Sequence, residues 1–131
     1  MQLNKDGIPI ANEAEAVEAV AAFVHALEQA DVSCRVKGVL VYGSRARGDW
    51  RTDSDIDVAV IIQGAFAPGE DLTILRALSD QTFDACAKHG FLISPIPVSE
   101  DELLAGHGRG NPAFCRNVQK DGVDWQNYCE A

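Results

Sequence analysis

The sequence predicts an α/β (α+β) fold in which a mixed β-sheet carries helices mostly on one face. Three apolar runs, at about residues 36–42, 55–62 and 91–98, are rich in β-branched side chains and have the length of strands. Two longer segments, residues 13–30 and 71–89, place apolar residues at helical spacing. Strands that alternate with amphipathic helices indicate a sheet covered by helices.

Length and composition predict one domain that spans residues 1–131. With 131 residues and 47% hydrophobic side chains, the chain can form a packed core. Its net charge of −9 and pI near 4.6 argue against binding to nucleic acid or an anionic membrane, and they suit a basic protein partner. There is no basic-plus-apolar leader and no apolar run of about 18 residues, so we expect a soluble cytoplasmic protein.

The first predicted helix begins at a capping box. Asn12 and Glu15 have the N-cap to N3 spacing of that motif. Apolar side chains follow at helical spacing, so we expect an amphipathic helix over residues 13–30 after a lead-in at 1–11. A turn at 31–35 then leads into the first strand.

The middle of the chain predicts a loop, a helix and an edge strand. Glycine and proline mark residues 63–69 as a loop before the helix at 71–89. In the strand at 91–98, Pro95 and Pro97 both lack the N–H group that a neighbouring strand would pair with. A strand of this kind is expected at the edge of the sheet.

The C-terminal part predicts short elements. Ser99 and Glu102 form a second capping box, which begins a helix at about 100–105. The remaining elements are a glycine-rich loop at 106–110, a helix that begins at Asn111-Pro112, a turn at Asp121-Gly122 and a small strand at 123–125.

The residues that indicate chemistry are concentrated between 39 and 62. The first strand ends at Gly43, which lacks a Cβ and therefore permits a sharp turn and a close approach to a ligand. Ser44 is predicted to begin a short helix, whose free N–H groups and dipole favour an anion. Fixed positive charge that suits phosphate oxygens follows at Arg45, Arg47 and Arg51.

Two acids open the second strand. Side chains alternate along a strand, so Asp55 and Asp57 should share one face, with Ile56 and Val58 on the other. Neighbouring carboxylates suit Mg²⁺, which prefers oxygen ligands. The alternative is a solvated strand end, but a carboxylate that leads into five apolar residues is costly unless it is paired or metal-bound. Val58 stands where a calcium-binding EF-hand loop needs glycine, and the chain has no P-loop motif.

This arrangement resembles a known family. Gly43-Ser44, ten intervening residues and Asp55-x-Asp57 between two apolar strands are similar to the nucleotidyltransferase superfamily, which includes DNA polymerase β. The segment GSRARGDWRTDSDIDVAVI resembles its minimal nucleotidyltransferase (MNT) branch in particular, and NPAFCRNVQKDGVDW resembles the end of related bacterial proteins. The resemblance implies the nucleotidyltransferase fold, with the phosphate site at the Gly43-Ser44 end of the sheet.

The resemblance also implies an activity. This activity is the transfer of a nucleoside monophosphate from an NTP, and specifically of AMP from ATP, with pyrophosphate as the leaving group. Asp55 and Asp57 are then the catalytic acids that bind Mg²⁺. The implied nucleotide-binding residues are Gly43, Ser44, Arg45 and Arg47.

A partner follows from the same resemblance. Stand-alone MNT proteins often act as antitoxins that bind, and in some cases adenylylate, a HEPN-domain toxin ribonuclease. The acidic charge of the chain agrees with such a protein partner. Two alternatives stay open: a non-catalytic module that binds nucleotide or partner, and an adenylyltransferase for a small molecule such as an aminoglycoside, which the lack of a further acceptor-binding domain disfavours.

One expected acid is missing. The superfamily usually carries a third metal-binding carboxylate on the strand at 91–98, but this run contains no acid, and Ser94 is its only polar side chain. Glu100 and Asp101 follow directly, yet acids there are better explained by the start of a helix. Because the third acid helps to activate the attacking hydroxyl, its loss should reduce chemistry more than ATP binding.

Overall fold

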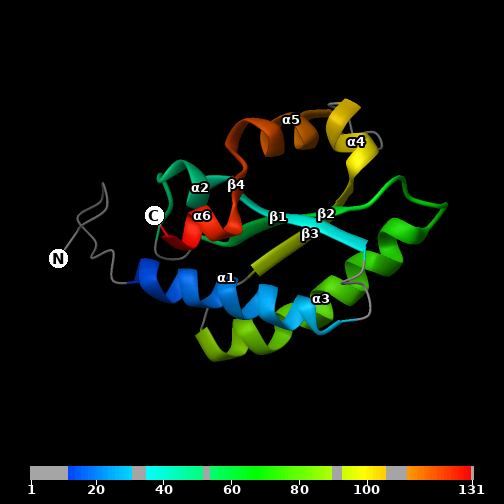
Figure 1. Cartoon of the computed structure of the whole chain (residues 1–131). Helices are drawn as coiled ribbons and strands as arrows, with labels where there is room; N and C mark the ends of the chain where they lie inside the picture. Colours follow the sequence, from blue (N-terminus) through cyan, green and yellow to red (C-terminus); the bar gives the residue numbers. More distant parts are fainter. Residues whose placement is uncertain (1–11, 31–34, 52–53, 90–92, 106–111, 131) are drawn as a thin grey trace.

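The computed structural model describes residues 12–30, 35–51, 54–89, 93–105 and 112–130. Helices and strands alternate through most of this part of the chain, as the sequence predicted (Figure 1). In chain order the elements are α1 (Asn12–Glu28), β1 (Val36–Tyr42), α2 (Ser44–Arg47), β2 (Ile56–Ile62), α3 (Glu70–His89), β3 (Ile93–Ser99), α4 (Glu100–Ala105), α5 (Pro112–Asp121), β4 (Val123–Asp124) and α6 (Trp125–Glu130).

The sheet is mixed, with the strand order β3-β2-β1-β4. β1 runs antiparallel to both β2 and β4, whereas β3 runs parallel to β2 and is reached through α3. The edge position predicted from Pro95 and Pro97 is confirmed, because β3 is the last strand on its side of the sheet.

The long helices α1 and α3 cover one face of the sheet (Figure 1). Phe23 of α1 and Leu78 of α3 are fully buried there, against Val41 of β1 and Val58 of β2. Removing a large aliphatic or aromatic side chain of this kind from water contributes about 1.5–3 kcal/mol. This layer is therefore the main hydrophobic core.

The short helices α4 and α5 cover part of the opposite face (Figure 1). Ala59 of β2 and Val98 of β3 are buried there against Cys115 and Val118 of α5. The predicted arrangement, with the long helices on one face, thus has a smaller second layer. Asp57 lies on the same face as Ala59, since the two residues are separated by one position in β2.

Most element boundaries agree with the sequence prediction, and one predicted helix cap is present. The backbone N–H of Glu102 donates to the hydroxyl oxygen of Ser99 at 3.1 Å, so Ser99 caps α4 as expected. The small terminal strand predicted at 123–125 is only partly correct, because Trp125 already begins the unpredicted helix α6. The N–H of Gln126 donates to a carboxylate oxygen of Asp124 at 2.9 Å, which explains the change from strand to helix.

Some predicted features lie outside the described residues. They are the lead-in at 1–11, most of the turn at 31–35 and the glycine-rich loop at 106–110. Among the helices that the structure describes, none is both long enough and apolar enough to cross a membrane.

Candidate active site

The turn between β1 and α2 is built around Gly43. Its φ of 74° lies in the left-handed region, and a Cβ added to it would come within 2.6 Å of carboxylate oxygen Oδ2 of Asp57. Glycine is therefore required here both for the backbone conformation and for the contact with Asp57. α2 begins at Ser44, as predicted, and its first turn closes when the N–H of Arg47 donates to the carbonyl of Gly43 at 3.0 Å.

The second strand separates its acids from its core residues. Ile56 and Val58 are fully buried in the core under the long helices, so Asp57 between them points to the opposite face. Asp57 is half-buried at the start of β2, and Asp55 is exposed just before the strand. In the antiparallel register Asp57 pairs with Tyr42, the last residue of β1, which brings it next to Gly43.

The electrostatics of Asp57 show which charges reach it. Burial raises the pKa of its carboxyl above the ordinary value, the negative charge of Asp55 raises this pKa further, and the positive charge of Arg47 lowers it. The net direction is upward. Asp55 and Asp57 thus repel each other in the metal-free protein, and a cation bound between them would relieve that repulsion.

The position expected for a third acid is occupied by Ser94. In the parallel register between β2 and β3, Ser94 pairs with Asp57, and the two side chains share one face of the sheet. Within the described ranges, no group of three or more acidic, histidine or cysteine side chains could hold a metal ion. The candidate metal ligands in this part of the structure are therefore Asp55 and Asp57, whose charges act on each other.

Arg45 and Arg47 point in different directions although both lie in α2. Arg45 is only 3% exposed, its guanidinium lies 4.4 Å from the centre of the Trp50 ring, and Nη2 donates to the carbonyl of Ser54 at 2.9 Å. This side chain therefore holds the loop between α2 and β2 in place. Its predicted role in nucleotide binding stays a prediction.

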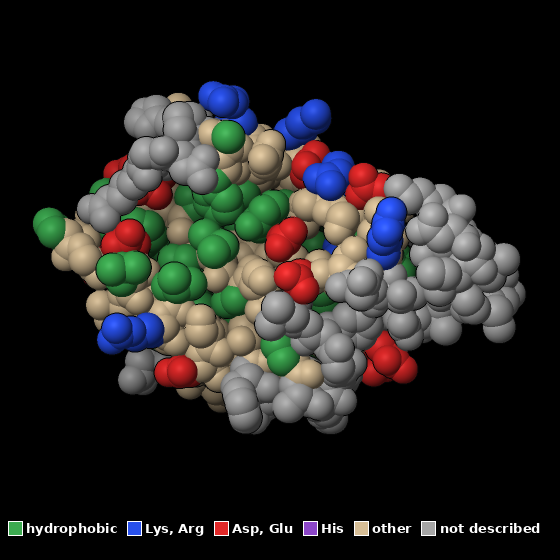
Figure 2. All heavy atoms as spheres, turned by 180° about the vertical axis from the view of Figure 1, so that it is seen from behind, with side chains coloured by type: hydrophobic (Ala, Val, Ile, Leu, Met, Phe, Trp, Pro, Cys, Tyr) green, Lys and Arg blue, Asp and Glu red, His purple; other side chains and the backbone are tan. Residues whose placement is uncertain are grey.

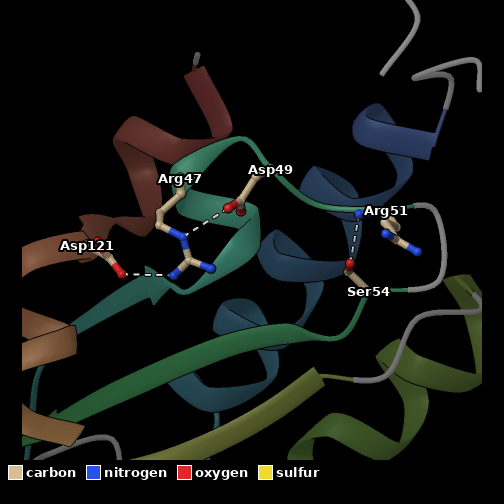
Figure 3. A network of polar contacts seen from close by, with 5 residues as sticks. All are labelled: Arg47, Asp49, Arg51, Ser54 and Asp121. Atoms are coloured by element: carbon tan, nitrogen blue, oxygen red, sulfur yellow. Dashed lines mark hydrogen bonds and ion pairs between the residues drawn. The ribbon is translucent and has the colours of Figure 1, made fainter. Parts of the chain in front are cut away.

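Arg47 lies at the surface of the site (Figure 3). Its Nε donates to Asp49 at 3.3 Å, and its Nη1 donates to Asp121 at 3.0 Å. Asp121 is the last residue of α5 and lies 74 positions further along the chain, so the sequence pattern did not reveal this ion pair. The side chain of Arg51 points away from this network, while its backbone N–H donates to the hydroxyl of Ser54 at 2.8 Å (Figure 3).

An aromatic pair borders the acids and was also missed from the sequence. The rings of Tyr42 and Phe114 meet edge to face, with centroids 5.8 Å apart and planes at 82°. Burial, and to a smaller extent the charge of Asp57, raises the pKa of Tyr42 to about 12. The Tyr42 ring is thus a partly buried neighbour of Asp57 that senses its charge.

Glu100 belongs to the other end of the sheet. Its carboxylate accepts a hydrogen bond from the N–H of Gly64 at 3.0 Å, and the N–H of Asp101 donates to the carbonyl of Gly64 at 3.2 Å. Ser94 and Glu100 are six positions apart, or roughly 20 Å at the usual rise of a parallel strand. Glu100 thus connects α4 to the loop after β2 and is too distant to act as the third acid.

The surface around these elements combines several side-chain types. In Figure 2, acidic side chains stand in the middle of the face opposite to the view of Figure 1, between an area of hydrophobic side chains and a group of basic ones.

Comparisons with known proteins show a family and a similar fold. The chain matches the family model "Polymerase beta, Nucleotidyltransferase" over residues 26–123. It is 31% identical over 109 residues to a protein of Methanocaldococcus jannaschii named "Putative protein adenylyltransferase", with 80% of this chain and 92% of that protein covered. The crystal structure of a "putative nucleotidyltransferase" from Sulfolobus solfataricus is similar with a TM-score of 0.61 and 20% identity, over 88% of this chain and 83% of that one. At this identity the likeness concerns the fold alone.

Proposed function

The chain belongs to the polymerase β nucleotidyltransferase family, and from this membership we propose that it transfers AMP from ATP to a hydroxyl group of an acceptor protein, with Mg²⁺. The observation that carries the proposal is the contact between Gly43 and the carboxylate of Asp57. Phosphates bound at the turn and a metal bound at that carboxylate would lie close enough to share oxygen atoms, which nucleotidyl transfer requires.

Asp55 and Asp57 are the residues that would hold Mg²⁺. Burial and then the charge of Asp55 raise the pKa of Asp57, and a divalent cation would offset the unfavourable negative charge. An ion held by these carboxylates would supply positive charge to offset the negative charge that develops in the transition state. The two carboxylates therefore fit a hard cation with oxygen ligands.

Arg47 is the arginine best suited to contact phosphates. It is 46% exposed, and its charge already acts on Asp57. Arg45 instead contributes indirectly, because its buried guanidinium braces the loop that leads from α2 to Asp55. Gly43 and Ser44 would supply the backbone N–H groups and the hydroxyl that bind the outer phosphates.

A protein acceptor, such as a HEPN-domain toxin in an antitoxin pair, agrees with two observations. The relative in M. jannaschii is named "Putative protein adenylyltransferase", and it matches this chain over 92% of its own length. The net charge of −9 favours association with a basic surface and steers such a partner toward the protein. A small-molecule acceptor is supported by neither observation.

A second candidate function rests on Ser94. Because the residue opposite Asp57 is a serine, the site lacks a third carboxylate that could bind a second ion and deprotonate an acceptor hydroxyl. The protein would then bind Mg·ATP and its partner with little transfer. This non-catalytic binding module keeps the same fold and the same two metal ligands.

The experiment incubates the chain with α-labelled ATP and Mg²⁺, with and without the protein encoded next to it. The variant Asp55→Asn with Asp57→Asn should abolish labelling of the neighbour and Mg²⁺-dependent ATP binding. The matched control is Asp80→Asn with Asp101→Asn, which removes two exposed acids of α3 and α4.

The outcomes separate the two candidate functions. A neighbour that is labelled by the wild type and the control, but not by the site variant, supports the transferase. A stable complex that binds ATP and stays unlabelled supports the binding module. Unchanged Mg·ATP affinity in the site variant contradicts the assignment of both acids.

A further inference from the structure

Asp121 is a carboxylate at the nucleotide site that comes from a distant part of the chain. Its oxygen accepts the hydrogen bond from Nη1 of Arg47 at 3.0 Å, while only 11% of its side chain is exposed (Figure 3). We propose that Asp121 is a positioning residue, which fixes the Arg47 guanidinium so that its remaining N–H groups point to the triphosphate. This inference rests on the proposed function.

The fold places Asp121 near α2, which begins at the Gly43-Ser44 turn that the proposed function assigns to phosphate. β4 pairs antiparallel with β1, with Val123 opposite Val41. Asp121 is the last residue of α5, two positions before Val123, and its hydrogen bond to Arg47 places it beside α2. The turn after α5 is tight, because the N–H of Gly122 donates to the carbonyl of Val118 at 2.8 Å. Asp121 is therefore held by the backbone on both sides.

The geometry of Arg47 leaves donors for a ligand. Among the described residues its contacts use Nε and Nη1, so Nη2 is available, and nearly half of the side chain is exposed. A guanidinium is a planar fork that carries five N–H donors, so a hydrogen bond that holds one N–H group also restricts the directions of the others. A pre-oriented fork binds phosphate with less loss of side-chain freedom than a mobile one.

Exposed ion pairs usually contribute little to stability, so the partial burial of Asp121 is what distinguishes this pair. The low exposure limits the access of water to the carboxylate and makes Arg47 its main compensating charge. Asp49, the other partner of Arg47, is half exposed and lies only two residues away in sequence. The constraint on Arg47 thus comes mainly from Asp121.

The two possible roles of Asp121, orienting Arg47 or acting only through its negative charge, predict opposite effects on Mg·ATP affinity when Asp121 is removed. Removing a negative charge near an anion site should strengthen the binding of Mg·ATP if Asp121 acts only through its charge. If Asp121 orients Arg47, its removal should weaken binding, because the fork is no longer held toward the phosphates. The sign of the change in affinity therefore decides between the two.

The test measures the affinity of the full chain for Mg·ATP and for magnesium tripolyphosphate by calorimetry at fixed salt. Asp121→Asn should weaken both by roughly fivefold to tenfold, as expected for the loss of a charge-assisted hydrogen bond that orients a ligand contact. Asp124→Asn is the matched control, since it removes the same charge three residues away without a contact to Arg47. It should bind equally well or slightly better.

Two further variants make the result specific. In an Arg47→Ala background, Asp121→Asn should cause no additional weakening, because the residue it orients is gone. Arg47→Lys keeps the charge at an exposed position and removes the fork, so it should lose affinity to a similar extent even if Asp121→Asn folds poorly.

Several results would overturn the inference. The inference is wrong if Asp121→Asn binds Mg·ATP as tightly as the wild type or more tightly. It is also wrong if Arg47→Lys keeps the wild-type affinity for Mg·ATP. An additive loss in the Arg47→Ala background means that Asp121 acts elsewhere. A wild-type chain that binds neither Mg·ATP nor magnesium tripolyphosphate refutes the proposed function itself, and the positioning role with it.

Discussion

Asp57 of β2 and Ser94 of β3 are register partners across the parallel pair of strands, and their side chains lie on the same face of the sheet. The sheet therefore presents a hydroxyl where a further metal-binding carboxylate could stand. Ile96, two positions along β3, pairs with Ala59 and lies further from the acids. This relationship makes Ser94 the position at which the effect of a third acid can be tested.

Ser94→Asp should raise the rate of AMP transfer. An acid at this position could bind a second cation and accept the proton of the attacking hydroxyl, and general-base catalysis typically contributes about 10²–10⁴-fold. The measurement is the initial rate of label transfer from ATP at saturating Mg²⁺. Ser94→Asn adds a similar volume without charge and should leave the rate unchanged. An equal rate in Ser94→Asp would show that the missing acid does not limit transfer.

Asp57→Asn should stabilise the metal-free protein at neutral pH. The pKa of Asp57 is raised above its ordinary value of 3.8, so ionisation costs stability in the folded state. This cost is present at pH 7 and disappears as the pH falls below the ordinary value, where the carboxyl is protonated in both states. Melting temperatures in EDTA should therefore differ at pH 7 and converge at acidic pH.

Asp55→Asn provides the comparison for that experiment. It removes the smaller of the two causes that raise the pKa of Asp57 and leaves burial, the larger cause, in place. It should give a smaller gain in melting temperature of the same sign. A melting temperature that falls at pH 7 in Asp57→Asn would show that this carboxylate has a stabilising partner in the folded protein.

Gly43→Ala should destabilise the fold and abolish Mg·ATP binding. A side chain at a positive φ costs about 1–3 kcal/mol, and this Cβ would also collide with the Asp57 carboxylate at 2.6 Å. Gly69→Ala is the matched control, because Gly69 has a φ of 78° and no atom within 4 Å of the added Cβ. Urea unfolding should show a larger loss for Gly43→Ala. Equal losses, with Mg·ATP binding retained, would mean that the contact with Asp57 is not required.

Glu100→Ala should reduce stability and leave nucleotide chemistry unchanged. It removes the carboxylate that accepts the hydrogen bond of Gly64, which is expected to cost about 1–2 kcal/mol. Glu100→Gln keeps an acceptor oxygen and should cost less. Urea unfolding and the transfer assay are measured on the same preparations. Loss of transfer in Glu100→Gln with intact ATP binding would show that Glu100 is the displaced third acid.

The sequence was sufficient to predict those features that depend on local chemistry. Alternation along the chain indicated that Asp57 and the buried Ile56 face opposite ways, and the two prolines of β3 predicted an edge strand. Gly43 was identified because a sharp turn between a strand and a helix needs a residue without a Cβ. Each of these signals comes from backbone geometry within a few residues, so no knowledge of distant contacts was needed.

Only the tertiary structure decided which distant residues meet at the site. Strand register, which sequence periodicity leaves open, places Tyr42 and Ser94 beside Asp57. Packing turns Arg45 inward and Arg47 outward, although both follow the same turn. Asp121 reaches Arg47 across 74 residues because β4 pairs with β1 and brings the end of α5 to α2. The residue types for nucleotide chemistry are thus local properties of the chain, whereas their orientation depends on register and packing between distant elements.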